Sequence, residues 1–206
     1  SGFVDLAITQ AGASGSITVG GLLNASSAVA GTTGGQVTVQ APRIETYFGE
    51  PGNSVLSADG PAGGGSIALG DANTRSVIVG AGSILRADAL ARGDGGSIAV
   101  RATYNSAPGA NGPLARTTFG VADVYGTLLA RGGPNGGNGG HIETSGTALN
   151  TSLQFVGNPT ATSAIVDARA QSAAGLSGTW TLDPFDVTIT NAATVAVNGE
   201  FQPIGP

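Results

Sequence analysis

The most distinctive string of chemically capable side chains is Trp180-x-Leu182-Asp183-Pro184-x-Asp186, which places two carboxylates three positions apart. In polysaccharide hydrolases, two carboxylates flank the bond that is broken. Such a site needs further acidic or basic groups, and none is clustered near this string in the sequence. We therefore interpret the motif as structural: Trp180 caps or fills a core, Asp183 accepts backbone hydrogen bonds at a bend, and Pro184 ends a strand.

Three other groups of residues have types that could bind a metal or a nucleotide. His141 and Glu143 share one side of a strand, but alone they supply at most half of a metal site. Asp88 and Gly93-Asp94-Gly95 are of the kind found in calcium-binding β-roll turns, yet the nonapeptide repeat of such turns is absent. The glycine-rich segment 132–140 lacks the Lys-Ser/Thr pair of a phosphate loop. We therefore predict no catalytic residue, no metal and no cofactor.

Two triplets match the acceptor sequence for N-glycosylation, Asn24-Ala25-Ser26 and Asn150-Thr151-Ser152. Such triplets also arise by chance in a chain that is rich in Ser and Thr. Asn24 and Asn150 are therefore candidate glycosylation sites that need a test.

These side chains belong to a chain that repeats itself. The pattern Leu-x-Ala-x followed by Gly-Gly-x-(Ile/Val)-x-(Val/Leu) returns five times, with small variations, and its alanines are Ala25, Ala58, Ala87, Ala130 and Ala168. The Ile-type position follows each alanine after 9 to 12 residues, whereas successive alanines lie 33, 29, 43 and 38 residues apart. Repetition on this scale is typical of a solenoid. The turn between the alanine and the Ile-type position has a nearly fixed length, so we expect the insertions in one region of the rest of each coil.

Alternation of apolar and polar residues predicts short strands with one buried face. It is seen in segments 3–9, 16–19, 36–39, 66–69, 97–100 and 186–190. Gly or Pro interrupts nearly every window that is long enough for a helix. We predict an all-β fold, a right-handed parallel β-helix of three strands per coil, as one domain over residues 1–206. Segments 102–116 and 132–140 are predicted to be loop excursions from the coil.

The repeats should stack like side chains above one another inside the solenoid. The alanines would form one interior ladder, and Val37, Ile67, Ile98 and Ile142 would form another. We expect Ala58, Ala87 and Ala130 to be buried, because a narrow interior favours a small side chain at that position.

The composition limits the classes of function. Eight basic residues stand against 13 acidic ones, only 10% of the chain is charged, and the mean hydropathy is +0.18. Such a chain has no electrostatic attraction for nucleic acid or for an anionic membrane surface. Cysteine and methionine are absent, which predicts no disulfide and a chain that begins inside a longer precursor. No apolar run is long enough for a membrane span, and no signal peptide is visible.

Segments 125–133, 136–146 and 178–189 together resemble a region shared by filamentous-haemagglutinin-like exoproteins, with Gly178-Thr179-Trp180-Thr181-Leu182-Asp183-Pro184-Phe185-Asp186-Val187-Thr188-Ile189 as the longest match. These are large β-helical adhesins of Gram-negative bacteria that are exported by two-partner secretion. The resemblance covers residues 125–190 strongly and the preceding residues only through the coil pattern. The Asn-Pro-Asn motifs of the family's secretion domain are not recognisable. The resemblance implies a right-handed β-helix, outside the cell or at its surface, with an adhesive or scaffolding role.

Three functions are therefore open. The leading hypothesis is a non-enzymatic, structural or adhesive β-helix, which would bind a glycan or protein receptor of a host or a matrix. The alternatives are a carbohydrate-active β-helix enzyme and a subunit of a polymerising filament. Segments 3–9 and 194–197 are strand-like and apolar, so we expect the ends to associate with neighbouring coils or with a second copy.

Overall fold

The computed structural model describes residues 2–8, 14–46, 54–103, 120–151, 164–184, 194–197 and 200–203. Within these residues the chain is all-β, without a helix, and most strands belong to three parallel sheets. Sheet A contains β1 (Phe3–Ala7), β4 (Gln36–Gln40), β7 (Ser66–Leu69), β10 (Ser97–Ala102), β13 (His141–Gly146) and β16 (Thr179–Pro184). Sheet B contains β2 (Ser16–Val19), β5 (Arg43–Thr46), β8 (Ser76–Val79), β11 (Val121–Val124) and β14 (Ala148–Thr151). Sheet C contains β3 (Leu22–Asn24), β6 (Val55–Ser57), β9 (Ile84–Arg86), β12 (Thr127–Leu129) and β15 (Ile165–Asp167).

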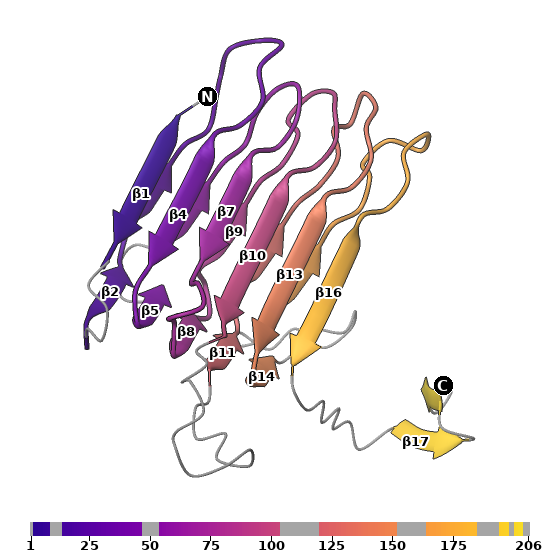
Figure 1. The fold of residues 1–206 in the computed structure, drawn as a ribbon. Helices are drawn as coiled ribbons and strands as arrows, with labels where there is room; N and C mark the ends of the chain where they lie inside the picture. The colour runs from indigo at the N-terminus through magenta and orange to yellow at the C-terminus, as the bar shows by residue number, and fades with distance from the viewer. Residues whose placement is uncertain are drawn as a thin grey trace.

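The chain visits the three sheets in turn and then repeats, so that each round forms one coil of a parallel β-helix. The strands of sheet A lie side by side in chain order from β1 to β16, which places the two edge strands at opposite ends of the stack (Figure 1). Each strand pairs in register with the strand of the next coil, as the partners Val37↔Ile67 and Ile67↔Ile98 show. The predicted β-helix is confirmed.

The core is a set of one-residue ladders that run along the solenoid. The predicted ladder from Val37 continues through Ile98↔Ile142 and ends at Trp180. A second ladder of Leu23, Leu56, Leu85, Leu128 and Val166 faces it from sheet C. The side chains of these two ladders are fully buried in the inner coils. Ala58, Ala87 and Ala130 have an exposed fraction of 0%, so the predicted alanine ladder is confirmed.

The turn from sheet C back to sheet A explains why the repeat has two halves. In each coil the second glycine of the Gly-Gly pair donates its N–H to the carbonyl of the alanine. The Gly65-to-Ala58, Gly96-to-Ala87 and Gly140-to-Ala130 bonds are each 2.7 Å long. This hydrogen bond joins the same two positions of the repeat in every coil. The chain from the alanine to the Ile-type position varies only from 9 to 12 residues. The Leu-x-Ala motif therefore supplies the acceptor, and the Gly-Gly motif the donor, of the hydrogen bond that closes each turn.

Glycine occurs as a pair at the closure because both positions touch neighbouring coils. A Cβ on the first glycine would lie 1.7–2.1 Å from the carbonyl of the alanine one turn of the solenoid further along the chain, as at Gly64 and Ala87. A Cβ on the second would lie 1.8–2.1 Å from the carbonyl of the second glycine in the preceding coil, as at Gly96 and Gly65. Real Cβ atoms essentially never approach another atom to less than 3.0 Å. The two glycine columns thus let successive coils come together at this turn.

Two expectations about loops were wrong. Segment 132–140 is no excursion: it is the turn between β12 and β13, and it stacks on the turn before it, with the Gly133 N–H bonded to the Gly93 carbonyl at 2.9 Å. The extra chain is also not confined to one region of each coil. Segment 104–119 lies between sheets A and B in sequence, whereas segments 47–53 and 152–163 lie between sheets B and C, and all three are outside the described residues.

The C-terminal part holds one antiparallel hairpin, β17 (Thr194–Val197) with β18 (Glu200–Pro203). The strand expected at Thr194–Val197 is thereby confirmed. The strand expected at segment 186–190 lies outside the described residues.

Candidate functional site

The Trp180 motif lies in β16, the last strand of sheet A. The indole packs against the apolar core and remains partly exposed, and its Nε1–H donates to the Thr144 hydroxyl of the preceding coil at 3.1 Å. Leu182 follows on the same face and is 43% exposed, because no described coil covers it. Trp180 therefore covers the end of the Ile ladder, as the sequence predicts.

The prediction for Asp183 was wrong in its detail. This residue lies inside β16, in register with Ser145, and its exposed side chain faces away from the core rather than standing at a bend. β16 is described as far as Pro184, and the residues that follow lie outside the described residues, so the expected strand end at Pro184 stays a prediction. Asp186 lies outside the described residues, so the structure does not place the two carboxylates relative to each other.

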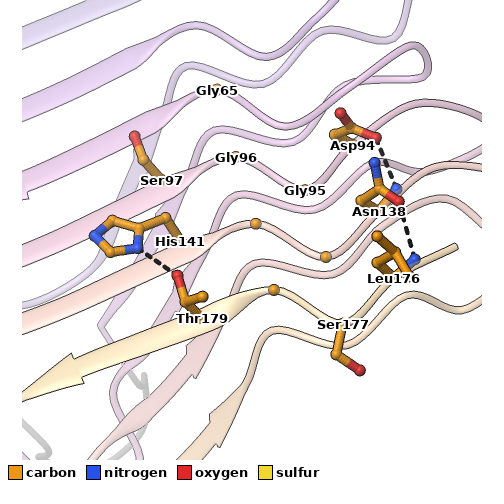
Figure 2. A pocket seen from close by; sticks show the side chains of 13 residues that line it. Gly65, Asp94, Gly95, Gly96, Ser97, Asn138, His141, Leu176, Ser177 and Thr179 are labelled. Atoms are coloured by element: carbon orange, nitrogen blue, oxygen red, sulfur yellow. Dashed lines mark hydrogen bonds between the residues drawn. The ribbon is translucent and has the colours of Figure 1, made fainter.

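A shallow, open depression of about 600 Å³ crosses the closures of three successive coils (Figure 2). Its floor is peptide backbone at the stacked glycine pairs, including Gly95–Gly96 and Gly139–Gly140. Missing side chains create it, because the two glycine columns leave a strip without Cβ atoms between the turns and the start of sheet A. The sequence analysis did not predict this feature, although the repeated Gly-Gly pairs carry the signal for it.

Polar side chains border the depression on both sides. On the sheet side, the His141 imidazole Nδ1 lies 2.7 Å from the Thr179 hydroxyl oxygen. On the turn side, the Asp94 carboxylate accepts the Asn138 N–H at 2.7 Å, and the Asn138 side-chain carbonyl accepts the Leu176 N–H at 2.9 Å (Figure 2). Asp94 therefore links neighbouring turns of the solenoid, and its contacts give no support to a calcium-binding role.

Glu143 shares the outer face of β13 with His141, as predicted, but its partner is a cation on the neighbouring strand. Arg101 of β10 holds the Glu143 carboxylate through two guanidinium hydrogen bonds, of which the one from Nε is 2.8 Å long. The Ser145 hydroxyl donates a further bond of 2.7 Å. The hydrogen bond from Arg101 is the main reason that the pKa of Glu143 falls from 4.5 to about 2. Glu143 is thus a firmly ionised carboxylate, unsuited to act as a general acid.

A column of charged residues occupies the position directly after the alanines of the ladder. The Asp59 carboxylate, 1% exposed, accepts the Asp88 N–H at 2.9 Å and pairs with Arg86 at 2.7 Å. One coil further, the Asp88 carboxylate accepts the Arg131 N–H at 2.7 Å and pairs with the Arg131 guanidinium at 2.7 Å. Each carboxylate therefore ties its coil to the next one through both the backbone and a side chain.

Burial raises the pKa of Asp59 above its ordinary value of 3.8, although the Asp88 N–H and the Arg86 guanidinium act in the opposite direction. A raised pKa on a buried carboxylate can mark an acid catalyst. The Asp59 carboxylate pairs with Arg86 and accepts the Asp88 N–H of the next coil. These structural contacts explain why it is buried. Asp88 has the same kind of partners, and for this reason the calcium-like pattern at Asp88 is better explained by coil stacking.

Within the described part of the chain, no three His, Asp or Glu side chains gather as metal ligands would. No helix there could span a membrane. Both candidate glycosylation residues are on strands with exposed side chains. The Asn24 side-chain oxygen accepts the Ser26 N–H at 2.9 Å, and the Asn150 amide donates to the Asp123 carboxylate at 2.7 Å. The Asn150 nitrogen that would carry a glycan is thus already hydrogen-bonded.

Comparison of the chain with protein-family models and with curated proteins gives no match. The relation to filamentous-haemagglutinin-like exoproteins therefore continues to rest on the sequence resemblance alone.

Proposed function

We propose that this β-helix is a structural or adhesive module of the filamentous-haemagglutinin-like type, that it has no enzymatic activity, and that it acts outside the cell or at the bacterial surface. The observation that supports this proposal best is the use made of its carboxylates. Asp59, Asp88 and Glu143 each bind an arginine, in pairs that join neighbouring coils. Groups that hold coils together in this way support a rigid rod rather than acid–base chemistry.

The surface that we propose for a receptor is the depression at the coil closures, together with the adjoining outer face of sheet A. Its floor is peptide backbone, and its rim offers hydroxyl, imidazole, amide and carboxylate groups from Ser97, His141, Asn138 and Asp94. Such a mixture suits the hydroxyl groups of a glycan or the polar backbone of an extended peptide. Receptors of a host or of an extracellular matrix present both.

A binding survey tests the proposal. The purified chain should bind members of a panel of matrix proteins and polysaccharides and should release no reducing sugar from them. Ser97→Arg places a long charged side chain at the rim of the depression and should weaken that binding. Gln36→Arg is the matched control, because Gln36 is exposed at the equivalent position of β4, away from the depression.

Two results would contradict the proposal. Equal loss of binding in both arginine variants would show that the added charge, not the depression, is responsible. Release of sugar by the wild-type chain, lost on Asp183→Asn, would favour the carbohydrate-active enzyme instead.

A further inference from the structure

The rims of the depression at the coil closures carry polar atoms that the fold does not use. Asp94 holds the neighbouring turn through Oδ1 alone, and Asn138 holds the Leu176 N–H through its own Oδ1. His141 contacts the Thr179 hydroxyl through Nδ1. Within the described part of the chain, Asp94 Oδ2, Asn138 Nδ2 and His141 Nε2 have no hydrogen-bond partner. Each side chain is thus fixed by one polar atom and offers the other to a ligand, which reduces the entropy lost on binding.

The rim residues recur from coil to coil. Figure 2 shows one row on each side of the glycine floor, with Ser97, His141 and Thr179 on the sheet side and Asp94, Asn138 and Leu176 on the turn side. The rows run along the solenoid axis, across the strands. A pair of facing rim groups therefore recurs at each closure, at the strand spacing of about 4.8 Å.

The floor has no N–H group left for a peptide. Each glycine of the floor donates its N–H within the solenoid, namely Gly65, Gly95, Gly96, Gly139, Gly140 and Gly178. A peptide that adds as a strand obtains its affinity from main-chain hydrogen bonds, and its carbonyls would find no donor here. Its side chains would also recur on one face at about 6.6 Å, out of step with coils spaced by about 4.8 Å. An extended peptide therefore fits the depression poorly.

A pyranose ring has the chemistry that this surface accommodates. Its C–H faces can lie on a backbone floor without forming hydrogen bonds, while the hydroxyls around its edge donate and accept at the two rims. In an extended glycan, each sugar advances the chain by nearly the spacing of the coils, so successive sugars meet equivalent rim positions. None of the residues that line the depression is Lys or Arg, and Asp94 is a carboxylate, so an acidic sugar would be repelled.

We propose that the depression binds a neutral, linear polysaccharide of pyranose units, which lies along the solenoid axis with one sugar above each closure. The first sugar lies between Ser97 and Asp94, and the second between His141 and Asn138. The third rests against Leu176, whose side chain is 75% exposed. The inference rests on the receptor role proposed above for the same depression, and it narrows that role to one class of ligand.

An NMR titration of the full chain tests the proposal, because the chain has a single histidine and the signals of the His141 imidazole report on the rim itself. The neutral probes are linear oligomers of glucose and of N-acetylglucosamine. The comparison probes are linear oligomers of glucuronic acid and an extended Thr-Val repeat peptide. A neutral oligomer should shift the signals, with an affinity that increases up to the trisaccharide and then changes little, since the depression crosses three closures. The acidic oligomers and the peptide should bind at least about tenfold more weakly.

Asn138→Asp changes only the unused polar atom of one rim side chain. It replaces the amide nitrogen by oxygen and keeps Oδ1, which accepts the Leu176 N–H. It should weaken binding of the neutral oligomers about tenfold, which corresponds to one hydrogen bond, and should keep a thermal midpoint close to that of wild type. Asn73→Asp is the matched control, because it adds the same charge on an exposed side chain in the turn between β7 and β8, outside the depression. Its affinity should equal that of wild type.

Three results would overturn the proposal: no binding of any neutral oligomer, tighter binding of the acidic oligomers or the peptide, or wild-type affinity of Asn138→Asp. The failure of this inference differs from that of the receptor surface. If the neutral oligomers do not bind while Ser97→Arg still weakens binding of a matrix protein and Gln36→Arg does not, the surface is right and the class of ligand is wrong. Equal effects of the two arginine variants would remove the surface itself.

Discussion

Replacing Gly96 with alanine tests the explanation of the glycine columns directly. A Cβ on Gly96 would lie 2.0 Å from the Gly65 carbonyl oxygen, whereas real Cβ atoms keep at least 3.0 Å. The two coils must therefore separate locally by about 1 Å, the difference between these distances. Two hydrogen bonds stretch as a result, the 2.9 Å bond from the Ser97 N–H to the Gly65 carbonyl and the 2.7 Å bond from the Gly96 N–H to the Ala87 carbonyl.

The expected loss follows from these contacts. Two weakened hydrogen bonds account for about 1 kcal/mol each, and the overpacked site adds strain of about 1–3 kcal/mol. We expect Gly96→Ala to lower the free energy of unfolding by about 3–5 kcal/mol. For a chain of this size that corresponds to a thermal midpoint lower by about 6–20 °C.

Gly20→Ala is the matched control, because a Cβ on Gly20, between β2 and β3, meets nothing within 4 Å. Its midpoint should be unchanged or slightly higher, since alanine restricts the unfolded chain. Both variants are compared by calorimetry and by urea denaturation at low protein concentration. Equal stability of Gly96→Ala and Gly20→Ala would refute the role that we assign to close approach of the coils.

Three further predictions concern the core, the acid response and catalysis. Ala87→Leu should lower the free energy of unfolding by about 1–3 kcal/mol, because Ala87 is completely buried between two alanines of its ladder; an unchanged urea midpoint would contradict this packing. The Arg101 hydrogen bond lowers the pKa of Glu143 from 4.5 to about 2, so its stabilisation is fully present above pH 4.5 and is lost as the pH falls toward 2. Glu143→Gln should flatten that part of the stability–pH curve by less than about 1 kcal/mol, since Arg101 is half-exposed, and a variant as acid-sensitive as wild type would argue against the ion pair. Asp183→Asn should leave glycan turnover undetectable before and after the change, as measured by reducing-end release.

The sequence was sufficient to predict the coil and its interior. The distance from Ala58 to Ile67 or from Ala87 to Ile98 is almost constant because one backbone hydrogen bond closes each turn. A fixed turn keeps apolar residues in register from coil to coil, and so the alanine and isoleucine ladders can be identified without coordinates. Trp180 could be placed at the core for the same reason.

The polar columns and the insertions could not be predicted in the same way. Arg101 and Glu143 are 42 residues apart, and Asp88 and Arg131 are 43 apart, so that each pair becomes visible only when the coils are aligned. The distance between successive alanines covers two further corners besides the closure, and therefore it does not reveal which of the two holds an insertion. The depression was missed because the repeated Gly-Gly pairs that signal it were interpreted only as turns of the coil and not as a strip without side chains.

The equivalent closures make one coil, from one closure glycine to the next, a natural unit for recombination of the gene. Because Gly65 and Gly96 enter equivalent closures, a deletion of the residues between two such glycines would remove one complete coil and bring two matching edges together. A duplication between the same points would add a coil with its ladders already in phase. Unequal crossing-over at these Gly-Gly codons can therefore lengthen or shorten the rod in whole steps while the surviving coils keep their shape.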